Sequence, residues 1–294
     1  MAILTDKFLQ FLGKLKINTR DFNSLSKKNF NDEAIKNWSE SPCGSNYSEK
    51  EFMTREYFDE IERHRYFTHP WIVDTINSFN LREKKVLEIG CGMGTDHLAM
   101  ARKGGIMHAI DLIPRNLEVT QKRFKIHRYK TRVTIGDAEF LPYASNTMDF
   151  IYSFGVLHHS PDTEKTISEV HRVLKTGGRC YITVYNKHSI FFWWTIYFWN
   201  FILKGGWKKR TLQQQLSLIE YPNINPNMVT RLYRKKEFKE LFSQFKNATQ
   251  SIKHLIPADI VYFSSFFRDP FKPTHFLKRL GDRLGWYIAI EATK

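Results

Sequence analysis

The chain has 294 residues, a formal net charge of +15 and a hydrophobic content of 42%. This composition excludes a disordered chain, because it can bury a sizeable core, and the length allows one large domain with insertions or two small domains. The positive charge favours anionic partners such as nucleic acid, anionic lipid headgroups or a phosphorylated substrate, but charge alone does not choose among them.

The cysteines and the first residues of the chain bear on its location. The three cysteines, Cys43, Cys91 and Cys180, are too few and too scattered for a disulfide framework or a zinc site, so we expect no metal. Charged and polar residues interrupt the apolar ones near the start, which argues against a secretory signal. These features predict a reducing, cytoplasmic location.

The N-terminal segment, residues 1–80, is expected to form a helical extension that caps the rest of the chain. Its first apolar residues recur at helical spacing among lysines and predict a basic amphipathic helix: Leu4, Phe8, Phe11, Leu12 and Leu15. We favour packing of this helix on the domain over docking on a membrane. A turn at Pro42 and Gly44 follows it.

A glycine-rich turn lies between a predicted strand and a predicted helix. Residues 85–89 are typical of a buried strand, and Gly90, Gly92 and Gly94 follow at once. Glycine lets the backbone approach a ligand closely and adopt positive φ angles. Thr95 stands where a dinucleotide fingerprint has its third glycine, and no P-loop lysine follows, so neither NAD binding nor ATP hydrolysis is expected.

Strands and helices then alternate, which predicts a mostly parallel sheet with helices on both faces. The expected strands are 85–89, 106–111, 132–136, 148–154 and 178–185, and the expected helices are 95–103, 114–127 and 162–174. A further helix is expected at 235–245, a sixth strand at 248–252 and a closing strand at 286–292. Ligands of such sheets bind beyond the carboxyl ends of the strands, where Gly90, Asp111, Asp137 and Phe154 lie.

Several short motifs follow one another in the order and spacing of a known family. After the glycine turn and Asp111 they are Gly136-Asp137-Ala138-Glu139, Leu141-Pro142, Met148 to Ser153, Val156-Leu157-His158-His159 and Leu174 to Gly178. On these residues the chain resembles the class I S-adenosylmethionine (SAM) dependent methyltransferases, from roughly Val86 to Tyr185. The resemblance implies an α/β fold with a Rossmann-like, seven-stranded, mostly parallel sheet whose last strand is antiparallel. It also implies SAM as the cofactor.

The resemblance divides the chain and assigns its cofactor residues. Residues 81–294 would form the methyltransferase domain, with insertions at about 186–234 and 257–284. Glu88 would anchor the methionine amino group of SAM, and Asp111 would accept from the ribose hydroxyls. The other implied cofactor contacts are the backbone of Gly90, Cys91, Gly92 and Gly94 along methionine and ribose, Leu112, Asp137 and Ala138 around the adenine, and Ser153 and Phe154 beside the methionine and the acceptor.

Candidate catalytic and carboxylate-binding residues lie on either side of this core. His158 and His159 follow the fourth strand, and imidazole has a pKa suited to a base near neutrality. The paired histidine is common in this family across unlike substrates, which favours a structural role in shaping the loop. Arg65 and Tyr66 are candidates for binding a carboxylate of SAM or substrate, because Arg offers a bidentate fork. The alternative for both is a surface helix with solvated charges.

The first insertion holds the most apolar segment of the chain, residues 190–203. Fourteen residues fall short of the roughly 20 that span a bilayer as a helix. Its Trp and Tyr residues, followed by Lys204, Lys208, Lys209 and Arg210, suit either a lid over an apolar pocket or an interfacial membrane anchor. We favour the lid, expect the second insertion to join it, and keep peripheral membrane contact as the second interpretation.

These observations favour an enzyme, a SAM-dependent methyltransferase acting on a small acceptor that is anionic or amphiphilic. A nucleic-acid methyltransferase is an alternative, because the chain combines basic and aromatic residues. Against it, Ser153-Phe154-Gly155-Val156 stands in place of the Asp/Asn-Pro-Pro-aromatic motif of nucleobase amino-group methyltransferases. A SAM-binding partner protein without catalysis is the other alternative, since cofactor motifs report binding only.

Overall fold

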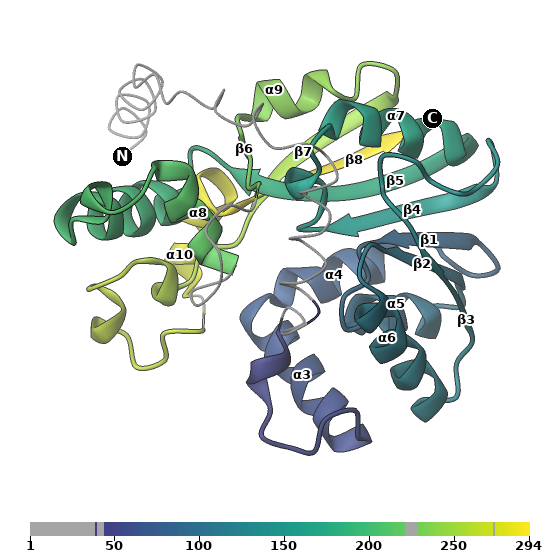
Figure 1. Ribbon diagram of the computed structural model, residues 1–294, viewed down its shortest axis with the longest axis horizontal. Coiled ribbons are helices and arrows are strands. Elements are labelled where there is room, and N and C mark those ends of the chain that lie inside the picture. Colours follow the sequence, from purple (N-terminus) through teal and green to yellow (C-terminus); the bar gives the residue numbers. More distant parts are fainter. Residues whose placement is uncertain (1–38, 40–43, 221–228, 273) are drawn as a thin grey trace.

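The computed structural model describes residues 39, 44–220, 229–272 and 274–294 (Figure 1). The predicted amphipathic helix near the start of the chain, and Cys43, lie outside the described residues. The described part of the N-terminal segment contains a short 3₁₀ turn, η1 (Ser45–Tyr47), and two helices, α3 (Arg55–Thr68) and α4 (Pro70–Ser78).

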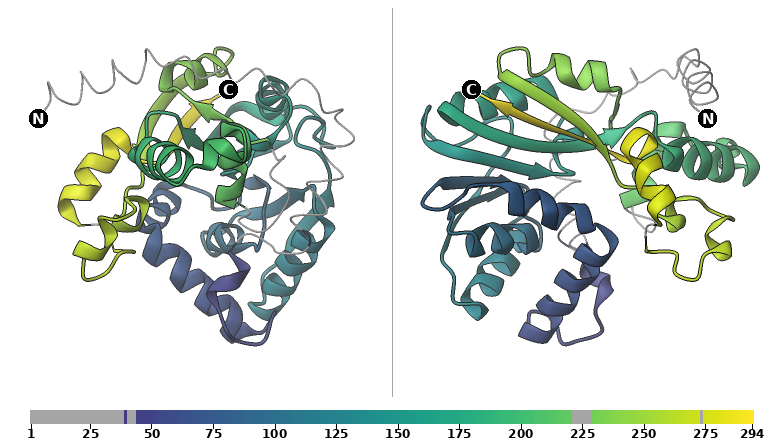
Figure 2. Two further views of the ribbon diagram at one scale, coloured as in Figure 1. Left: turned by 60° about the vertical axis from the view of Figure 1, so that its left-hand side comes forward. Right: turned by 180° about the vertical axis from the view of Figure 1, so that it is seen from behind.

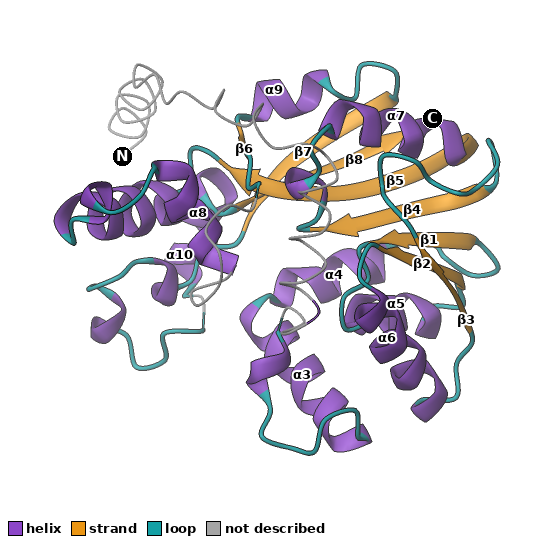
Figure 3. Cartoon of the chain, viewed as in Figure 1, coloured by secondary structure: helices purple, strands orange, loops and turns teal. Residues whose placement is uncertain are grey.

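The strands form one sheet of eight in the order β3-β2-β1-β4-β5-β8-β7, with β6 paired to β5 off this path (Figure 3). Their bounds are β1 Lys85–Ile89, β2 Ile106–Asp111, β3 Thr131–Ile135, β4 Met148–Phe154, β5 Leu174–Asn186, β6 Leu232–Tyr233, β7 Lys246–Lys253 and β8 Tyr287–Thr293. The pairs among β1 to β6 are parallel, and β8 runs antiparallel to both β5 and β7. The predicted Rossmann-like sheet is confirmed, and β6 is an addition that the sequence did not predict.

Helices cover both faces of this sheet, as predicted (Figure 1). The helices on one face are α3, α4, α5 (Thr95–Arg102) and α6 (Pro114–Ile126), and those on the other are α7 (Thr163–Val173) and α9 (Lys235–Glu240). Leu87 and Ile89 of β1 pack in the core on the α7 face, whereas Val86 packs with α4, α5 and α6. Burial on both faces explains why these strands read as nearly continuous apolar runs.

The chain leaves β1 toward β2 on one side and reaches β4 on the other, so the strand order reverses between β1 and β4. In open α/β sheets the ligand crevice lies at such a reversal, beyond the carboxyl ends of the strands. The turn after Ile89 and the end of β4 at Phe154 therefore flank the expected crevice.

A buried arginine holds α3 over this edge of the sheet. Arg123 of α6 donates from Nη2 to the Phe58 carbonyl (2.7 Å) and from Nη1 to the Thr95 hydroxyl (2.5 Å). Its guanidinium also lies over the Phe58 ring, 4.7 Å from the ring centroid. Burial lowers the pKa of Arg123 to about 10. One side chain thus connects α6 to α3 and to the start of α5.

The two insertions pack together into a lobe beyond the end of the sheet (Figure 2). Its elements are η3 (Phe191–Leu203, a π-helix), η4 (Gly206–Lys208), α8 (Leu212–Glu220), η5 (Pro257–Asp259), η6 (Ser264–Phe266) and α10 (His275–Leu284). The Thr195 hydroxyl donates to the Asp259 carbonyl (2.6 Å), and Trp194 Nε1 donates to the Val261 carbonyl (3.0 Å). Among the described residues, no helix combines the length and apolar character needed to cross a bilayer.

We predict that the buried side chains of η3 contribute to the stability of the fold and that its exposed side chains do not. Phe192 is 0% exposed and Phe198 is 40% exposed, so Phe192→Ala should lower the free energy of unfolding by about 3–5 kcal/mol and Phe198→Ala by less than about 1 kcal/mol. Urea unfolding followed by circular dichroism would measure both. Similar losses for the two variants would contradict this prediction.

Candidate cofactor and acceptor site

The turn between β1 and α5 has the backbone conformation that its glycines predict. The φ angles of Gly90, Gly92 and Gly94 are 75°, 50° and 68°, a region that favours glycine. A Cβ on Gly90 would overlap Val156 Cγ2 and lie 2.8 Å from its Cγ1, whereas a Cβ on Gly92 would meet nothing within 4 Å. The backbone at Gly92 therefore faces open space, and that at Gly90 is closed by the loop after β4.

Asp111, at the end of β2, fastens this turn to the neighbouring strand. Its carboxylate is buried and accepts hydrogen bonds from the N–H groups of Gly92 (3.1 Å) and Ile113 (3.0 Å) and from the Asn116 amide (3.2 Å). Burial raises the pKa of Asp111, and these hydrogen bonds oppose the rise. The residue predicted to accept from the ribose thus lies directly against the glycine turn.

Glu88, the predicted anchor of the amino group, is buried on β1 beside α5. Its Oε2 lies 2.9 Å from His97 Nδ1, but the two atoms are not aligned as a hydrogen bond. Burial lowers the pKa of His97 to about 3, so this imidazole is neutral, and its Nε2 lies 2.8 Å from the Thr131 hydroxyl. Burial also raises the pKa of Glu88 well above its ordinary value. One carboxyl oxygen of Glu88 therefore has no hydrogen bond within the described residues.

The residues predicted to surround the adenine lie beside Asp111. Leu112 follows β2, and Asp137 and Ala138 follow β3. The Gly136 N–H donates to the Asp111 carbonyl (3.1 Å), which holds the loop after β3 against the end of β2. Asp137 Oδ1 accepts from the Glu139 N–H (2.8 Å) and so fixes its own loop.

The end of β4 supplies one wall of the site. The buried Ser153 hydroxyl donates to the Ile89 carbonyl (3.0 Å), so it joins β4 to β1. The Phe154 ring lies 5.6 Å from the Trp71 ring and 5.0 Å from the Tyr287 ring. Phe154 thus belongs to an aromatic group at the carboxyl edge of the sheet.

Arg65 and Tyr66 converge on a carboxylate of the chain itself. Arg65 donates from Nε to Asp96 Oδ1 (2.7 Å) and from Nη2 to Asp96 Oδ2 (2.5 Å), and the Tyr66 hydroxyl lies 3.3 Å from Oδ1. The Tyr152 hydroxyl donates to Asp96 Oδ2 (2.9 Å). Burial and then Asp96 raise the pKa of Tyr66 well above its ordinary value. Their role toward a ligand carboxylate stays a prediction, and the contact we observe pins α3 to the first turn of α5.

His158 and His159 are buried in η2 (Leu157–His159). His159 Nδ1 lies 2.8 Å from the Val229 carbonyl, so Nδ1 carries the proton, and burial lowers the pKa of His159 to about 4. The His158 ring lies 3.9 Å from the Tyr185 ring, and neither of its nitrogens has a hydrogen-bond partner among the described residues. These contacts support the structural interpretation of the pair, and a catalytic role stays a prediction.

A second histidine pair, which the sequence reasoning missed, lies against the aromatic group. His69, between α3 and α4, and His254, after β7, stack with ring centroids 4.1 Å apart and an interplanar angle of 5°. The His69 ring lies 6.3 Å from that of Phe154 and 6.0 Å from that of Tyr287. Two histidines so far apart in the chain leave no local pattern that could have identified them.

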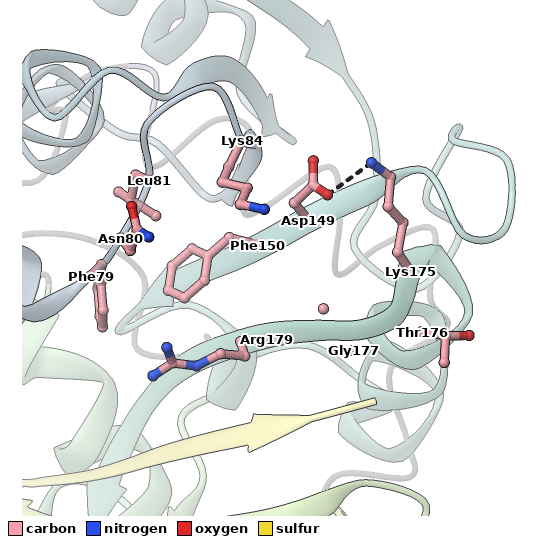
Figure 4. A pocket seen from close by; sticks show the side chains of 11 residues that line it. Phe79, Asn80, Leu81, Lys84, Asp149, Phe150, Lys175, Thr176, Gly177 and Arg179 are labelled. Carbon is pink, nitrogen blue, oxygen red and sulfur yellow. Dashed lines mark hydrogen bonds and ion pairs between the residues drawn. The ribbon is translucent and has the colours of Figure 1, made fainter.

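A pocket at the opposite edge of the sheet holds none of these residues (Figure 4). It lies where β4 and β5 begin, and its lining includes Phe79, Lys84, Phe150 and Arg179. There Lys175 Nζ donates to Asp149 Oδ1 (2.8 Å). Because ligands of parallel sheets bind at the carboxyl ends of strands, the site described above is the better candidate.

The fold is similar to those of solved methyltransferases. Magnesium protoporphyrin IX methyltransferase of Synechocystis with bound SAH (S-adenosylhomocysteine, demethylated SAM) has a TM-score of 0.53 at 14% identity, covering 91% of this chain and 97% of that chain. A SAM-dependent methyltransferase of Thermotoga maritima has a TM-score of 0.52 at 19% identity, covering 82% and 98%. At these identities the likeness shows the fold.

Residues 87–182 match a family model described as a methyltransferase domain. Residues 87–182 therefore carry a SAM-dependent methyltransferase domain of the class I type. Similar proteins include methyltransferase GfsG of Streptomyces halstedii (30% identity over 152 residues, 46% of this chain) and ubiquinone biosynthesis O-methyltransferase of Coxiella burnetii (26% over 129 residues, 42% of this chain). Phosphoethanolamine N-methyltransferase 2 of Caenorhabditis elegans is 34% identical over 106 residues, 35% of this chain. The matches span 55%, 55% and 24% of these relatives' lengths.

The site at the glycine turn fits SAM, the cofactor of the matching family. The open backbone at Gly92 leaves room for a ligand, as a side chain there would not. The Glu88 oxygen without a hydrogen bond can accept from an ammonium group. SAM carries an ammonium and a sulfonium, and the buried carboxyl groups of Glu88 and Asp111 give these positive charges a complementary environment, whereas Asp96 is already paired with Arg65.

We expect Gly90→Ala to weaken binding of SAH at least about tenfold, because the new Cβ would overlap Val156 and strain the positive φ. Titration calorimetry would measure the affinity. Gly177→Ala is the matched control, since Gly177 has a φ of 76° but a Cβ there would meet nothing within 4 Å. Gly90→Ala combined with Val156→Ala should recover part of the affinity, and equal affinities for all variants would refute the close packing at Gly90.

Proposed function

We propose that this chain transfers the methyl group of SAM to a small or amphiphilic acceptor. The observation that carries the proposal is the aromatic group beside the cofactor turn, formed by Trp71, Phe154 and Tyr287 and continued by Tyr185 and Trp286 toward η3. Aromatic walls with a few polar groups are typical of sites for apolar small molecules. The names of the relatives, which refer to ubiquinone biosynthesis and to phosphoethanolamine, support an acceptor of this class.

In this proposal the residues around the glycine turn hold the cofactor. Glu88 accepts from its amino group, Asp111 binds the ribose hydroxyls, and the backbone from Gly90 to Gly94 lies along the methionine and ribose. Asp137 and Ala138 bind the adenine edge. The support is that Asp111 and the Gly92 N–H are already hydrogen-bonded to each other, so the cradle is formed before any ligand binds.

SAM, when bound, supplies a methyl group on a positively charged sulfur, which needs no acid to leave. The chain's own work is therefore to align the acceptor, to exclude water and to take the acceptor's proton. We propose that Phe154 and Tyr287 form the wall against which the acceptor lies. Phe154 packs in the cluster that includes β1 and α5, which flank the cofactor turn, and both rings pack in the cluster that includes η3 of the lobe.

We propose His69 as the proton acceptor. The Thr68 hydroxyl donates its one hydrogen to the backbone carbonyls of His64 (2.9 Å) and Arg65 (3.1 Å), so it accepts at its 2.8 Å contact with His69 Nδ1. Nδ1 then carries the proton, and Nε2 keeps its lone pair. Burial lowers the pKa of His69 well below its ordinary value, which keeps the ring neutral and its Nε2 lone pair free at neutral pH but also makes the ring a weaker base.

Two other functions compete with this proposal. The net charge of +15 favours a nucleic-acid acceptor, although a basic surface by itself reads no base and selects no atom for methylation. A non-catalytic SAM-binding protein would need the same cofactor residues. Neither alternative accounts for the aromatic group at the carboxyl edge as directly as an enclosed small acceptor does.

Incubation of the purified chain with methyl-labelled SAM and a cell extract tests the function. We expect label in small organic-soluble products, and Asp111→Ala should lower SAM affinity about 10- to 100-fold because it removes charge-assisted hydrogen bonds. Asp282→Ala, on the exposed side of α10, is the matched control and should change neither. Label in RNA would support the nucleic-acid alternative, and SAH binding without any labelled product would support the non-catalytic one.

For His69 we expect His69→Gln to lower the rate of label transfer at saturating SAM about 100-fold while SAH affinity is unchanged. The acid limb of the wild-type pH–rate profile, where His69 becomes protonated, should disappear in the variant. His64→Gln, on the adjoining helix α3, is the control. An unchanged rate and profile for His69→Gln would rule out this proton acceptor.

A further inference from the structure

The lobe, residues 191–220 and 257–284, has an exposed surface that its packing against the sheet does not explain. Of the sixteen exposed large hydrophobic side chains among the described residues, nine lie in this lobe. They are Phe198, Ile202, Leu203, Trp207, Tyr262, Phe263, Phe266, Phe271 and Phe276. Monomeric soluble proteins rarely expose so many large apolar groups together without a binding partner.

Ring contacts show that the central part of this surface is continuous. Trp194 of η3 lies 5.3 Å from the Phe198 ring and 5.4 Å from the Phe263 ring, and Phe263 lies 6.2 Å from Phe266. Trp199 lies 5.5 Å from Tyr262. Rings from both insertions therefore form one patch, in which Phe266 is 76% and Tyr262 64% exposed.

Exposed cations border the patch. Between residues 187 and 219 the sequence has no Asp or Glu, and Lys204, Lys208 and Lys209 are exposed at the end of η3. In the second insertion the exposed cations are Arg268, Lys272, Lys278, Arg279 and Arg283. The acidic residues of this insertion are Asp259, Asp269 and Asp282, fewer than its cations, and Asp259 is buried and accepts from the Ile256 N–H (2.9 Å). The border of the patch therefore has an excess of positive charge.

Aromatic residues mixed with Lys and Arg are typical of protein surfaces that lie in the interface of an anionic bilayer. The rings enter the headgroup region, and the cations meet lipid phosphates. A second copy of the chain fits this surface poorly, because a two-fold contact would bring the same positive border against itself.

We propose that this lobe docks the protein on the surface of an anionic phospholipid bilayer. Because hydrogen bonds in a π-helix link residues five apart, Phe198, Ile202 and Leu203 come to lie on the outer side of η3. The inner side of the same helix, with Phe192, packs in the aromatic group that continues to Phe154. One helix thus separates the docking surface from the acceptor site, and the methyl acceptor is then a membrane-resident amphiphile. This last step rests on the proposed function.

Vesicle co-sedimentation of the full chain, without SAM or acceptor, tests the docking. We expect binding to vesicles that contain phosphatidylglycerol, weaker binding to phosphatidylcholine alone, and release by added salt. Tyr262→Ser combined with Phe266→Ser should weaken binding about tenfold or more, because two rings that would enter the bilayer are lost. The matched control is Ile135→Ser with Phe140→Ser, whose side chains are 63% and 57% exposed but lie outside the lobe.

Retained SAH binding by both double variants would show that they fold. Equal vesicle binding by wild type and the lobe variant would overturn the proposal, even if the chain still bound vesicles through its N-terminal segment. Failure of the wild type to bind anionic vesicles would overturn it as well, whether the chain instead self-associates or binds RNA. Because no methyl transfer is measured, docking can fail while the proposed enzymatic function stands, and the reverse also holds.

Discussion

Three buried carboxyl groups surround the turn that joins β1 to α5, and the site is built around their need for partners. A buried charge is costly unless hydrogen bonds or an opposite charge compensate it. Asp111 is met by two backbone N–H groups and an amide, and Asp96 by the Arg65 fork and the Tyr152 hydroxyl. Glu88 keeps one oxygen without a hydrogen bond among the described residues. This uneven compensation leaves Glu88 as the carboxyl group that a cationic ligand can pair with.

The same need explains the position of the N-terminal helices. Arg65 compensates Asp96 only if α3 lies over the glycine turn, and Arg123 holds α3 there through the Phe58 carbonyl. Helix α3 then ends before Pro70, because proline has no N–H to continue its hydrogen bonds. His69 lies between α3 and α4. The described part of the N-terminal segment is therefore bonded into the core and brings a histidine to the edge of β4.

What could be predicted from the sequence was local. The strand, the positive φ angles of Gly90 to Gly94, and Asp111 at the end of the next strand follow from residues close together in the chain. The partners of Asp96 and the stacking of His69 on His254 depend on contacts between distant segments, which no periodicity records. The two-residue strand β6 is too short to show alternation, and helical spacing cannot foretell the π-helical register of η3.

The lobe shows how one apolar segment can satisfy two environments. Residues 190–203 are apolar nearly all round, which for a helix predicts burial or a membrane. The structure buries the side that meets the sheet, where Phe192 and Ile196 pack with Trp286, and the side that meets the second insertion at Thr195. Folding alone does not account for the apolar character of the other side, because the rings there remain exposed beside lysines. A surface that must meet both lipid tails and phosphates would select for that combination, so in our proposal the two sides of η3 would serve as lid and as membrane anchor.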